Sequence, residues 1–384
     1  MKIATVIGIG ALMGATALGC SGNSPSTFGD PNSDNSGDDG STGASSGATS
    51  SSGSSGASSS GGTSGGGSSS GSTGGSNGGS SSGPVTTGGD GGVKVTTGGD
   101  GGVGNDPETD YSQTKTIQMD PFPVPANTEV FYCQTFQNPW GKQVDIKTYD
   151  LNMDTGSHHM FAFYQTNATN GTVAPCAAGG LTYGPFTFTS QAPKVSQTFP
   201  PTVGATIPTT TGFNVMAHYV NSGTTPLTAH VTLTMYIGKA GVVTNHAGVI
   251  FDNQATMSVP ATGKPVVSTQ SLAVNQDVNI ITASSHMHKF GSLFVSTATP
   301  PGGQPIQLYT TTNWDEPKAT VFATPLHLPS GTTITWSCTD TNTTGQTLTF
   351  GEYANTNVMC ISVNIFYPVT DINNPVLGSA IGGF

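Results

Sequence analysis

The 384-residue chain contains no arginine, because its ten basic residues are all lysines. These lysines stand singly along the sequence, whereas nucleic-acid binding requires clustered cations that displace counterions. The composition therefore argues against a nucleic-acid partner. Without arginine, the chain also cannot make a bidentate guanidinium contact with a carboxylate or a phosphate.

Long apolar runs are equally scarce, and the one at the N-terminus is typical of a signal peptide over residues 1–19. Lys2 precedes an apolar stretch that is too short and too rich in glycine and alanine for a spanning helix. The stretch ends in "ALGCS" (17–21), which resembles a bacterial lipobox and predicts lipidation of Cys20. Ordinary signal cleavage after Ala17 is the other interpretation.

Lipidation at Cys20 predicts an exported protein that touches the membrane only through its N-terminal lipid. Ser21 after this cysteine favours the outer membrane or cell surface of a bacterial envelope. The chain has five cysteines, an odd number for an exported protein. Lipidation of one leaves four, which pair by half as Cys133–Cys176 and Cys338–Cys360. Such bridges require an oxidising, extracytoplasmic location.

Residues 20–108 have too few apolar side chains to fold. They are mostly Ser, Gly and Thr, so we expect a disordered linker. The sequence "VTTGGDGGV" occurs twice, at 85–93 and 95–103. Two copies without a longer array favour a flexible tether over a calcium-binding repeat.

No segment of the remaining chain sustains a helical period. Short runs rich in Val, Ile, Thr, Phe and Tyr alternate with Gly, Pro, Asn and Ser, as in "EVFYCQTF" (129–136) and "NVMCISVNIFYP" (357–368). This pattern predicts an all-β protein made of antiparallel sandwiches or barrels. Each of two similar halves, 109–241 and 242–370, holds a histidine pair and two cysteines, and residues 371–384 form a tail.

Histidines are few, yet half of the eight lie in two close pairs. In "SSHMHKFG" (284–291), His286 and His288 occupy alternate positions of a strand. Their side chains then point to one face, roughly 7 Å apart at Cα, and can converge on one metal ion. Met287 points the other way, toward a core.

The other pair, His158 and His159, is adjacent in "SHHMFAFY" (157–164). Neighbouring strand residues face opposite sides, so both reach one ion only at a bulge or a strand end. Gly156 offers the necessary bend. His218, in "NVMAHYV" (214–220), is the candidate third ligand, although a half-buried strand histidine is the alternative.

Three further histidines have no partner nearby in the sequence. We expect structural or exposed roles for His230 and His246, and a loop position for His327 in "LHLPSG". The second pair therefore lacks a third histidine, and Met359 is the candidate in its place. If Cys360 bonds toward one face, Met359 must point to the other. Two histidines with a thioether would favour copper, above all Cu(I), whereas three histidines would accept copper or zinc.

This order of residues resembles the copper type II, ascorbate-dependent monooxygenases, the group of peptidylglycine α-hydroxylating monooxygenase and dopamine β-hydroxylase. The resemblance covers roughly residues 115–370 and includes "NWDEP" (313–317), "WSC" (336–338) and "MCISVNIFYP" (359–368). It implies two tandem jelly-roll-like β-sandwich domains that face each other across an open, water-filled cleft.

The resemblance also implies a role for each ligand. His158, His159 and His218 match an electron-transfer copper, and His286, His288 and Met359 match the catalytic copper where O₂ binds. Two copper ions per chain would be reduced to Cu(I) by ascorbate or another one-electron reductant. With O₂ they would hydroxylate a C–H bond of a small organic substrate. Cys338–Cys360 matches a disulfide of the family, and so does Cys133–Cys176.

Two positions depart from the peptide-amidating relatives, which carry an arginine two residues before His-x-His and a tyrosine four residues after the methionine. Here these positions are Ser284 and Val363, so peptidylglycine is not the expected substrate. A neutral or weakly polar molecule fits better. Two alternatives stay open: a copper-binding or copper-delivering lipoprotein without turnover, and a structural or adhesive sandwich with incidental histidines.

Overall fold

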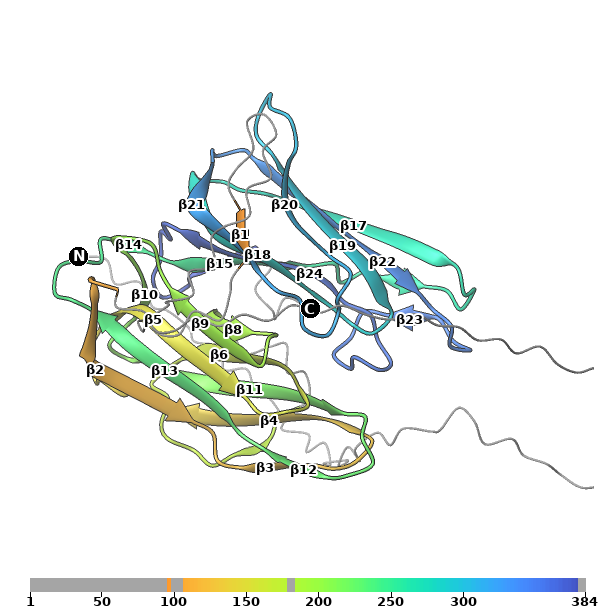
Figure 1. Cartoon of the computed structure of the whole chain (residues 1–384), viewed down its shortest axis with the longest axis horizontal. Helices are drawn as coiled ribbons and strands as arrows, with labels where there is room; N and C mark the ends of the chain where they lie inside the picture. Colours follow the sequence, from red (N-terminus) through yellow and green to blue (C-terminus); the bar gives the residue numbers. More distant parts are fainter. Residues whose placement is uncertain (1–94, 98–105, 178–183, 379–384) are drawn as a thin grey trace, which may run out of the picture. The chain divides into compact units, whose positions relative to one another are not determined.

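The computed structural model describes residues 95–97, 106–177 and 184–378, and every regular element in these ranges is a β-strand (Figure 1). The predicted all-β class is therefore confirmed. The described part of the chain holds no helix that is long and apolar enough to cross a membrane. The predicted signal peptide, Cys20 and most of the predicted linker lie outside the described residues.

The first half builds two mainly antiparallel sheets and a small ribbon from residues 109–238, and β14 from beyond this range joins one of the sheets. One sheet has the order β7 (Ala174–Pro175), β4 (Thr128–Phe136), β11 (Thr211–Asn221), β6 (Ser157–Thr166) and β8 (Phe186–Ser190). The other has the order β14 (Asn245–His246), β10 (Val203–Ile207), β5 (Val144–Met153), β13 (Val231–Gly238) and β2 (Thr109–Gln118), with β9 (Lys194–Thr198) also on β5. The ribbon joins β3 (Phe122–Val124) to β12 (Leu227–Ala229).

The second half repeats this plan with sheets of its own. Its first sheet has the order β1 (Val95–Thr97), β21 (Thr320–Leu328), β18 (Val278–Met287), β24 (Cys360–Tyr367), β15 (Gly248–Asn253) and β25 (Val376–Leu377). Its second has the order β17 (Pro265–Ala273), β22 (Thr333–Thr341), β19 (Gly291–Thr299) and β20 (Ile306–Thr311). A ribbon joins β16 (Ser258–Val259) to β23 (Leu348–Thr349).

Three strands refine the expected boundaries. β14 begins after residue 241 yet pairs in parallel with β10 of the first half. β25 lies in the segment expected to be a tail and pairs with β15, so this segment is ordered where it is described. β1 lies within the predicted linker and pairs with β21.

Buried and exposed side chains alternate along the strands. The buried side chains form one core in each half and a third apolar cluster between the halves. β13 and β22 alternate strictly between buried and partly exposed residues, the pattern of a strand with one face on a core. The third cluster joins aromatic residues of β6 and β8 to residues around β15 and β24. Its buried members are Phe161, Phe163, Phe186, Met216, Val249, Phe251, Met359 and Ile361. The two halves are thus packed together rather than tethered.

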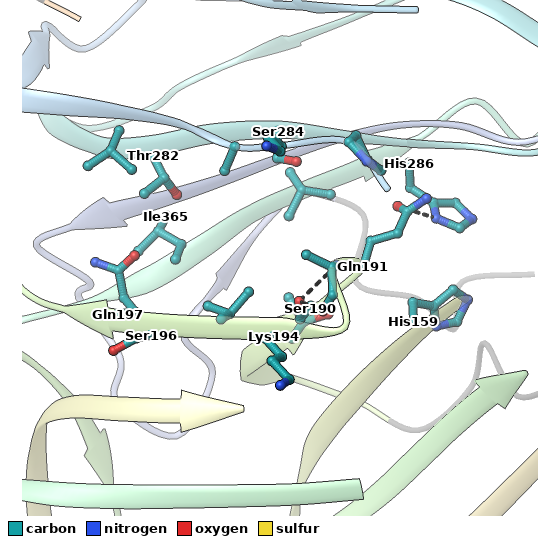
Figure 2. Close-up of a pocket in the computed structure, with 18 of the residues that line it drawn as sticks. His159, Ser190, Gln191, Lys194, Ser196, Gln197, Thr282, Ser284, His286 and Ile365 are labelled. Carbon is teal, nitrogen blue, oxygen red and sulfur yellow. Dashed lines mark hydrogen bonds between the residues drawn. The ribbon is translucent and has the colours of Figure 1, made fainter. Parts of the chain in front are cut away.

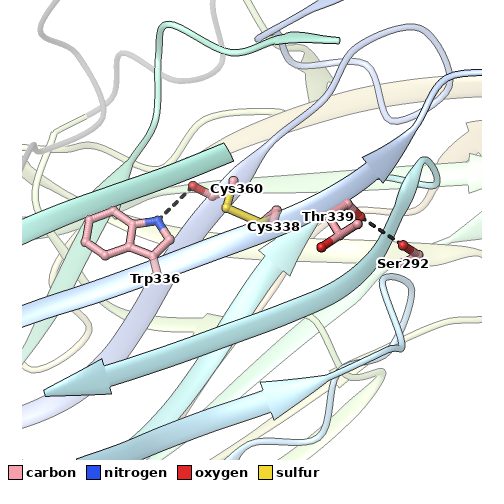
Figure 3. The surroundings of a disulfide bond; sticks show 5 residues. All are labelled: Ser292, Trp336, Cys338, Thr339 and Cys360. Atoms are coloured by element: carbon pink, nitrogen blue, oxygen red, sulfur yellow. Dashed lines mark hydrogen bonds between the residues drawn. A yellow bond between two sulfur atoms is a disulfide. The ribbon is translucent and has the colours of Figure 1, made fainter. Parts of the chain in front are cut away.

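Both predicted disulfides are present. Cys133 and Cys176 join β4 to the loop after β7 with Cα atoms 5.0 Å apart, and Cys338 and Cys360 join β22 to β24 with Cα atoms 5.7 Å apart. Beside the second bridge, the Trp336 indole N–H donates to the carbonyl of Cys360 at 3.2 Å (Figure 3). Two structural disulfides indicate an extracytoplasmic protein.

Candidate metal centre

The adjacent histidines of β6 lie at the bulge that the sequence predicts. His218 of β11 pairs with His159, but the next residue, Tyr219, pairs with Ser157. His158 is therefore the extra residue of β6, and its side chain can turn to the same side as its neighbour's. Gly156 just before it has φ of +88°, a conformation that favours glycine.

The second pair lies at the end of β18. His286 is opposite Ile361 of β24, and Met287 is opposite Cys360. Met287 is fully buried in the core of the second half, as predicted. His288 follows directly after the strand, so it shares the face of His286 with a slightly freer backbone.

These elements bring five histidines into one buried cluster. His158, His159 and His218 form one set of three potential ligand atoms within 4.8 Å of one another, and His158, His286 and His288 form a second. Both sets are buried, and His158 belongs to both. Within the sets, ring centroids lie 4.7 Å apart for His159 and His218 and 5.2 Å apart for His286 and His288. The cluster can therefore hold metal ions in two sets of three imidazoles.

Hydrogen bonds orient the rings so that lone pairs face the cluster. His286 donates from Nδ1 to the side-chain oxygen of Gln191 at 2.8 Å, and His288 donates from Nδ1 to the carbonyl of Asn357 at 3.1 Å. Each ring then has its lone pair on Nε2, and neither Nε2 has a hydrogen-bond partner among the described residues. This arrangement is the usual one for metal-binding histidines, in which the outer nitrogen donates and the inner one coordinates.

His218 faces the cluster with its other nitrogen. It donates from Nε2 to Glu129 at 2.7 Å, which leaves Nδ1 as the acceptor of a 3.0 Å hydrogen bond from Nε2 of His159. Burial alone would favour a neutral Glu129. The hydrogen bonds from His218, Ala354 and Asn355 nevertheless lower the pKa of this carboxyl below its usual range. A negatively charged carboxylate therefore accepts the hydrogen bond of His218 in the first set.

Four of the five imidazoles are uncharged at neutral pH. Burial and the neighbouring rings hold the pKa of His158, His159 and His286 well below the usual range. Burial and the nearby His218 lower the pKa of His288 to about 3. Neutral imidazole is the form that binds metals. The donor set, nitrogen without carboxylate, suits copper or zinc better than a hard cation.

Glu129 and Gln191, which the sequence did not single out, complete the centre together with Trp314 of "NWDEP". Glu129 of β4 also accepts hydrogen bonds from Ala354 and Asn355 of the second half. The Gln191 amide donates to the carbonyl of Trp314 at 2.6 Å, and the Trp314 ring lies 5.7 Å from His158. Strand alternation could have placed Glu129 on the face of Phe131 and Cys133, but no sequence pattern indicates Gln191.

Met359 lies directly before β24 and is buried in the apolar cluster between the halves. Cys360 belongs to the core of the second half instead, so the two side chains point to opposite faces, as predicted. The pairing of His286 with Ile361, continued by two residues, sets Met359 opposite His288. Its role as a ligand stays a prediction.

A pocket of about 840 Å³ borders the cluster at His159 and His286 (Figure 2). Thr282, Ser284 and His286 follow one another along β18 on its wall, and the hairpin of β8 and β9 lies opposite (Figure 2). Apolar side chains also line the pocket, among them Phe161, Phe251, Val321, Val363 and Ile365. This volume and this mixture of apolar walls with a few polar groups are typical of small-molecule sites.

The remaining histidines lie apart from this centre, as expected. His230 contacts Asp154, with Nδ1 2.6 Å from Oδ2, and Nδ1 of His246 lies 2.6 Å from the Thr206 hydroxyl. His327 is exposed and lies in β21 rather than in the expected loop.

The open cleft implied by the resemblance is not found between the two histidine sets. The His158 and His286 rings, one from each half, have centroids only 5.0 Å apart. The apolar cluster and the contacts of Glu129 hold the two halves together here, and the local sequence around each pair gives no sign of this docking.

No protein-family model matches the sequence, and a comparison with curated proteins finds no match. The solved structures reported next match with low identity and low TM-scores. The turret protein of an archaeal virus with a triple jelly roll shares 11% identity over 68% of this chain, with a TM-score of 0.19, and this chain spans 61% of it. The major capsid protein P2 of bacteriophage PM2 shares 9% identity over 67% of this chain and 99% of its own, with a TM-score of 0.26. The PBSX exported protein XepA shares 8% identity over 65% of this chain and 86% of its own, with a TM-score of 0.18.

Proposed function

We propose that the protein is a copper-dependent monooxygenase, an oxidoreductase that uses O₂ and a one-electron reductant such as ascorbate to hydroxylate a small organic substrate. The observation that carries this proposal is the five-histidine cluster on the wall of a substrate-sized pocket. Bound copper would supply the electron transfer and the oxygen activation that no side chain of the protein can perform.

The residues around the cluster have separable tasks in this proposal. Glu129 and Gln191 orient His218 and His286, and Asn357 orients His288. Met359 is the proposed further ligand of the His286 and His288 set. The five imidazoles themselves are buried, and exclusion of bulk water there would protect a reactive oxidant from side reactions.

The pocket lining supports a neutral substrate. Ser284 and Val363, which replace the arginine and tyrosine of peptide-amidating relatives, both line it. Its charged lining residues are Asp150, Lys194 and Lys318, and both lysines are exposed to solvent. A molecule with an apolar body and a hydroxyl, amine or amide group would match this lining.

The test uses the full chain loaded with copper, ascorbate and ¹⁸O₂, with a mixture of amines, phenethyl compounds and peptides as substrates. We expect a product that gains one ¹⁸O atom only when the reductant is present. His286→Ala should yield none, and His327→Ala, a change at an exposed histidine, should behave like the unmodified protein. Stoichiometric copper without product would instead favour a copper-binding or copper-delivering role. Absence of bound copper would favour a structural or adhesive sandwich.

We also propose that Cys20 carries the lipid that anchors the protein to the bacterial envelope. The lipobox-like sequence and the pairing of the four other cysteines in disulfides support it. Intact-mass analysis of the exported protein should show a diacylglyceryl or triacyl addition at an N-terminal cysteine. A mature chain that begins unmodified at Leu18 would refute the anchor.

A further inference from the structure

His158 differs from the four histidines around it in how its nitrogens are used. His159, His286 and His288 each engage one ring nitrogen in a hydrogen bond, and His218 engages both. Both ring nitrogens of His158 are buried, and neither has a hydrogen-bond partner within the part of the chain that the structure describes. Its ring therefore presents two potential ligand atoms, one on each side.

An imidazole in this position is costly if nothing binds it. A neutral ring always carries one N–H and one lone pair, and a buried polar group without a partner typically costs about 1–3 kcal/mol. His158 is only 1% exposed, so solvent does not satisfy either nitrogen. Native structures seldom leave such a group without a purpose.

The position of His158 fits contact with two ions rather than one. It is the residue shared by the two sets of ligand atoms. Its ring centroid lies 5.1 Å and 4.9 Å from those of His159 and His218, and 5.0 Å and 5.9 Å from those of His286 and His288. Spacings of this size suit imidazoles that share an ion at metal–nitrogen distances of about 2.0–2.1 Å.

We propose that His158 is a bridging ligand, an imidazolate that joins two metal ions through its two nitrogens. His159 and His218 complete the set for one ion, and His286 and His288 complete the set for the other. Coordination through both nitrogens displaces the single N–H proton of the ring into solvent. The ring then carries one negative charge between two cations, and both of its buried nitrogens are satisfied.

The identity of the metal as copper rests on the proposed function, but the bridge requires only two ions. With Cu(II) in both sets, a shared imidazolate pairs the unpaired electrons of the two ions antiferromagnetically. The two ions would then act as one electronic unit, unlike two sites that exchange electrons across solvent.

The experiment compares copper content with electron spin in the full chain loaded with Cu(II). Elemental analysis should give two copper ions per chain, while low-temperature electron paramagnetic resonance should detect far fewer spins than copper ions. His158→Ala should lose copper or recover a spin for each ion that it retains. His327→Ala is the matched control and should reproduce the coupled spectrum.

Two results would overturn the bridge: a single copper ion per chain, or two ions whose full spin count appears in the spectrum. If His158→Ala does not fold, the spin count of the unmodified protein still decides. Since no turnover is measured, a coupled pair without hydroxylation would refute only the proposed function. Hydroxylation by an uncoupled pair would refute only the bridge.

Discussion

The two halves of the molecule handle buried charge in opposite ways. In the first half, the fully buried Lys147 donates to the carbonyls of Phe199 and Pro200 and contacts Glu108 at 2.9 Å, and His218 is paired with Glu129. In the second half, the buried carboxyl of Asp340 has no hydrogen-bond partner in the described residues. His286 donates a hydrogen bond to the neutral amide of Gln191, and His288 donates one to the backbone carbonyl of Asn357.

This difference suggests different tasks for the two histidine sets. An anionic partner makes an imidazole a stronger donor and stabilises the more highly charged metal ion, whereas neutral partners do so less. We therefore expect the His218 set to favour Cu(II) more than the His286 set does. A thioether ligand such as Met359 would widen the difference, because it favours Cu(I).

The strongest test of this comparison removes one ligand from each set. His218→Ala and His286→Ala should each lower hydroxylation by more than about 100-fold, since even loss of a residue that only orients a ligand costs 10–100-fold. Each variant should bind less copper, measured by elemental analysis after loading and desalting. Wild-type activity in either variant would remove its set from the proposed centre.

Met359→Ile separates a ligand from a core residue. The two side chains have similar size and apolarity, so a purely packing role predicts a stability loss under about 1.5 kcal/mol and unchanged activity. A ligand role predicts a folded protein with little activity. X-ray absorption of the reduced, copper-loaded protein should show a Cu–S component that the variant lacks. Near-normal turnover, or no sulfur scatterer in the unmodified protein, would leave Met359 as a packing residue.

Glu129→Gln tests the carboxylate itself. The amide keeps the shape and one acceptor oxygen but removes the negative charge behind His218. We expect copper affinity to fall about 10–100-fold, and the copper that remains to be reduced more readily, as followed by a Cu(I)-specific chelator. Gln191→Ala is the matched change behind His286 of the other set, where no anion is lost. Equal shifts of the copper reduction potential in both variants would contradict the proposed difference between the two histidine sets.

The smallest effect concerns Asp340. Burial raises the pKa of its carboxyl to about 7, so between about pH 4 and 7 the folded state binds a proton that the unfolded state has released. The free energy of unfolding should therefore fall as the pH rises from about 4 to 7, by about 1.4 kcal/mol per pH unit at most. Above pH 7 this group should have no further effect. Asp340→Asn should flatten the slope in urea unfolding measured at pH 5 and pH 8. An unchanged slope would show that Asp340 has a partner.

The sequence predicted the parts of the centre that depend on local pattern. Strand alternation separated Met287 from His286 and His288, and adjacent histidines required the bulge that is found at His158. The shared position of His158 could not be predicted, because it depends on how two halves dock. Glu129 and Ala354 meet across 225 residues, and no local pattern encodes such a contact.

The contact of Glu129 with Ala354 also dictates when the centre can be completed. A chain is made and exported from its N-terminus, and early domains fold first. The loop of residues 353–357 holds Glu129 and supplies the carbonyl that orients His288, and Ala354 of this loop follows Glu129 by 225 residues. The candidate centre is therefore complete only after this loop has been made and exported to the compartment where the disulfides form. The metal ions that could fill the centre would then be those available outside the cytoplasm. The late completion of the centre would limit binding of other metal ions inside the cell.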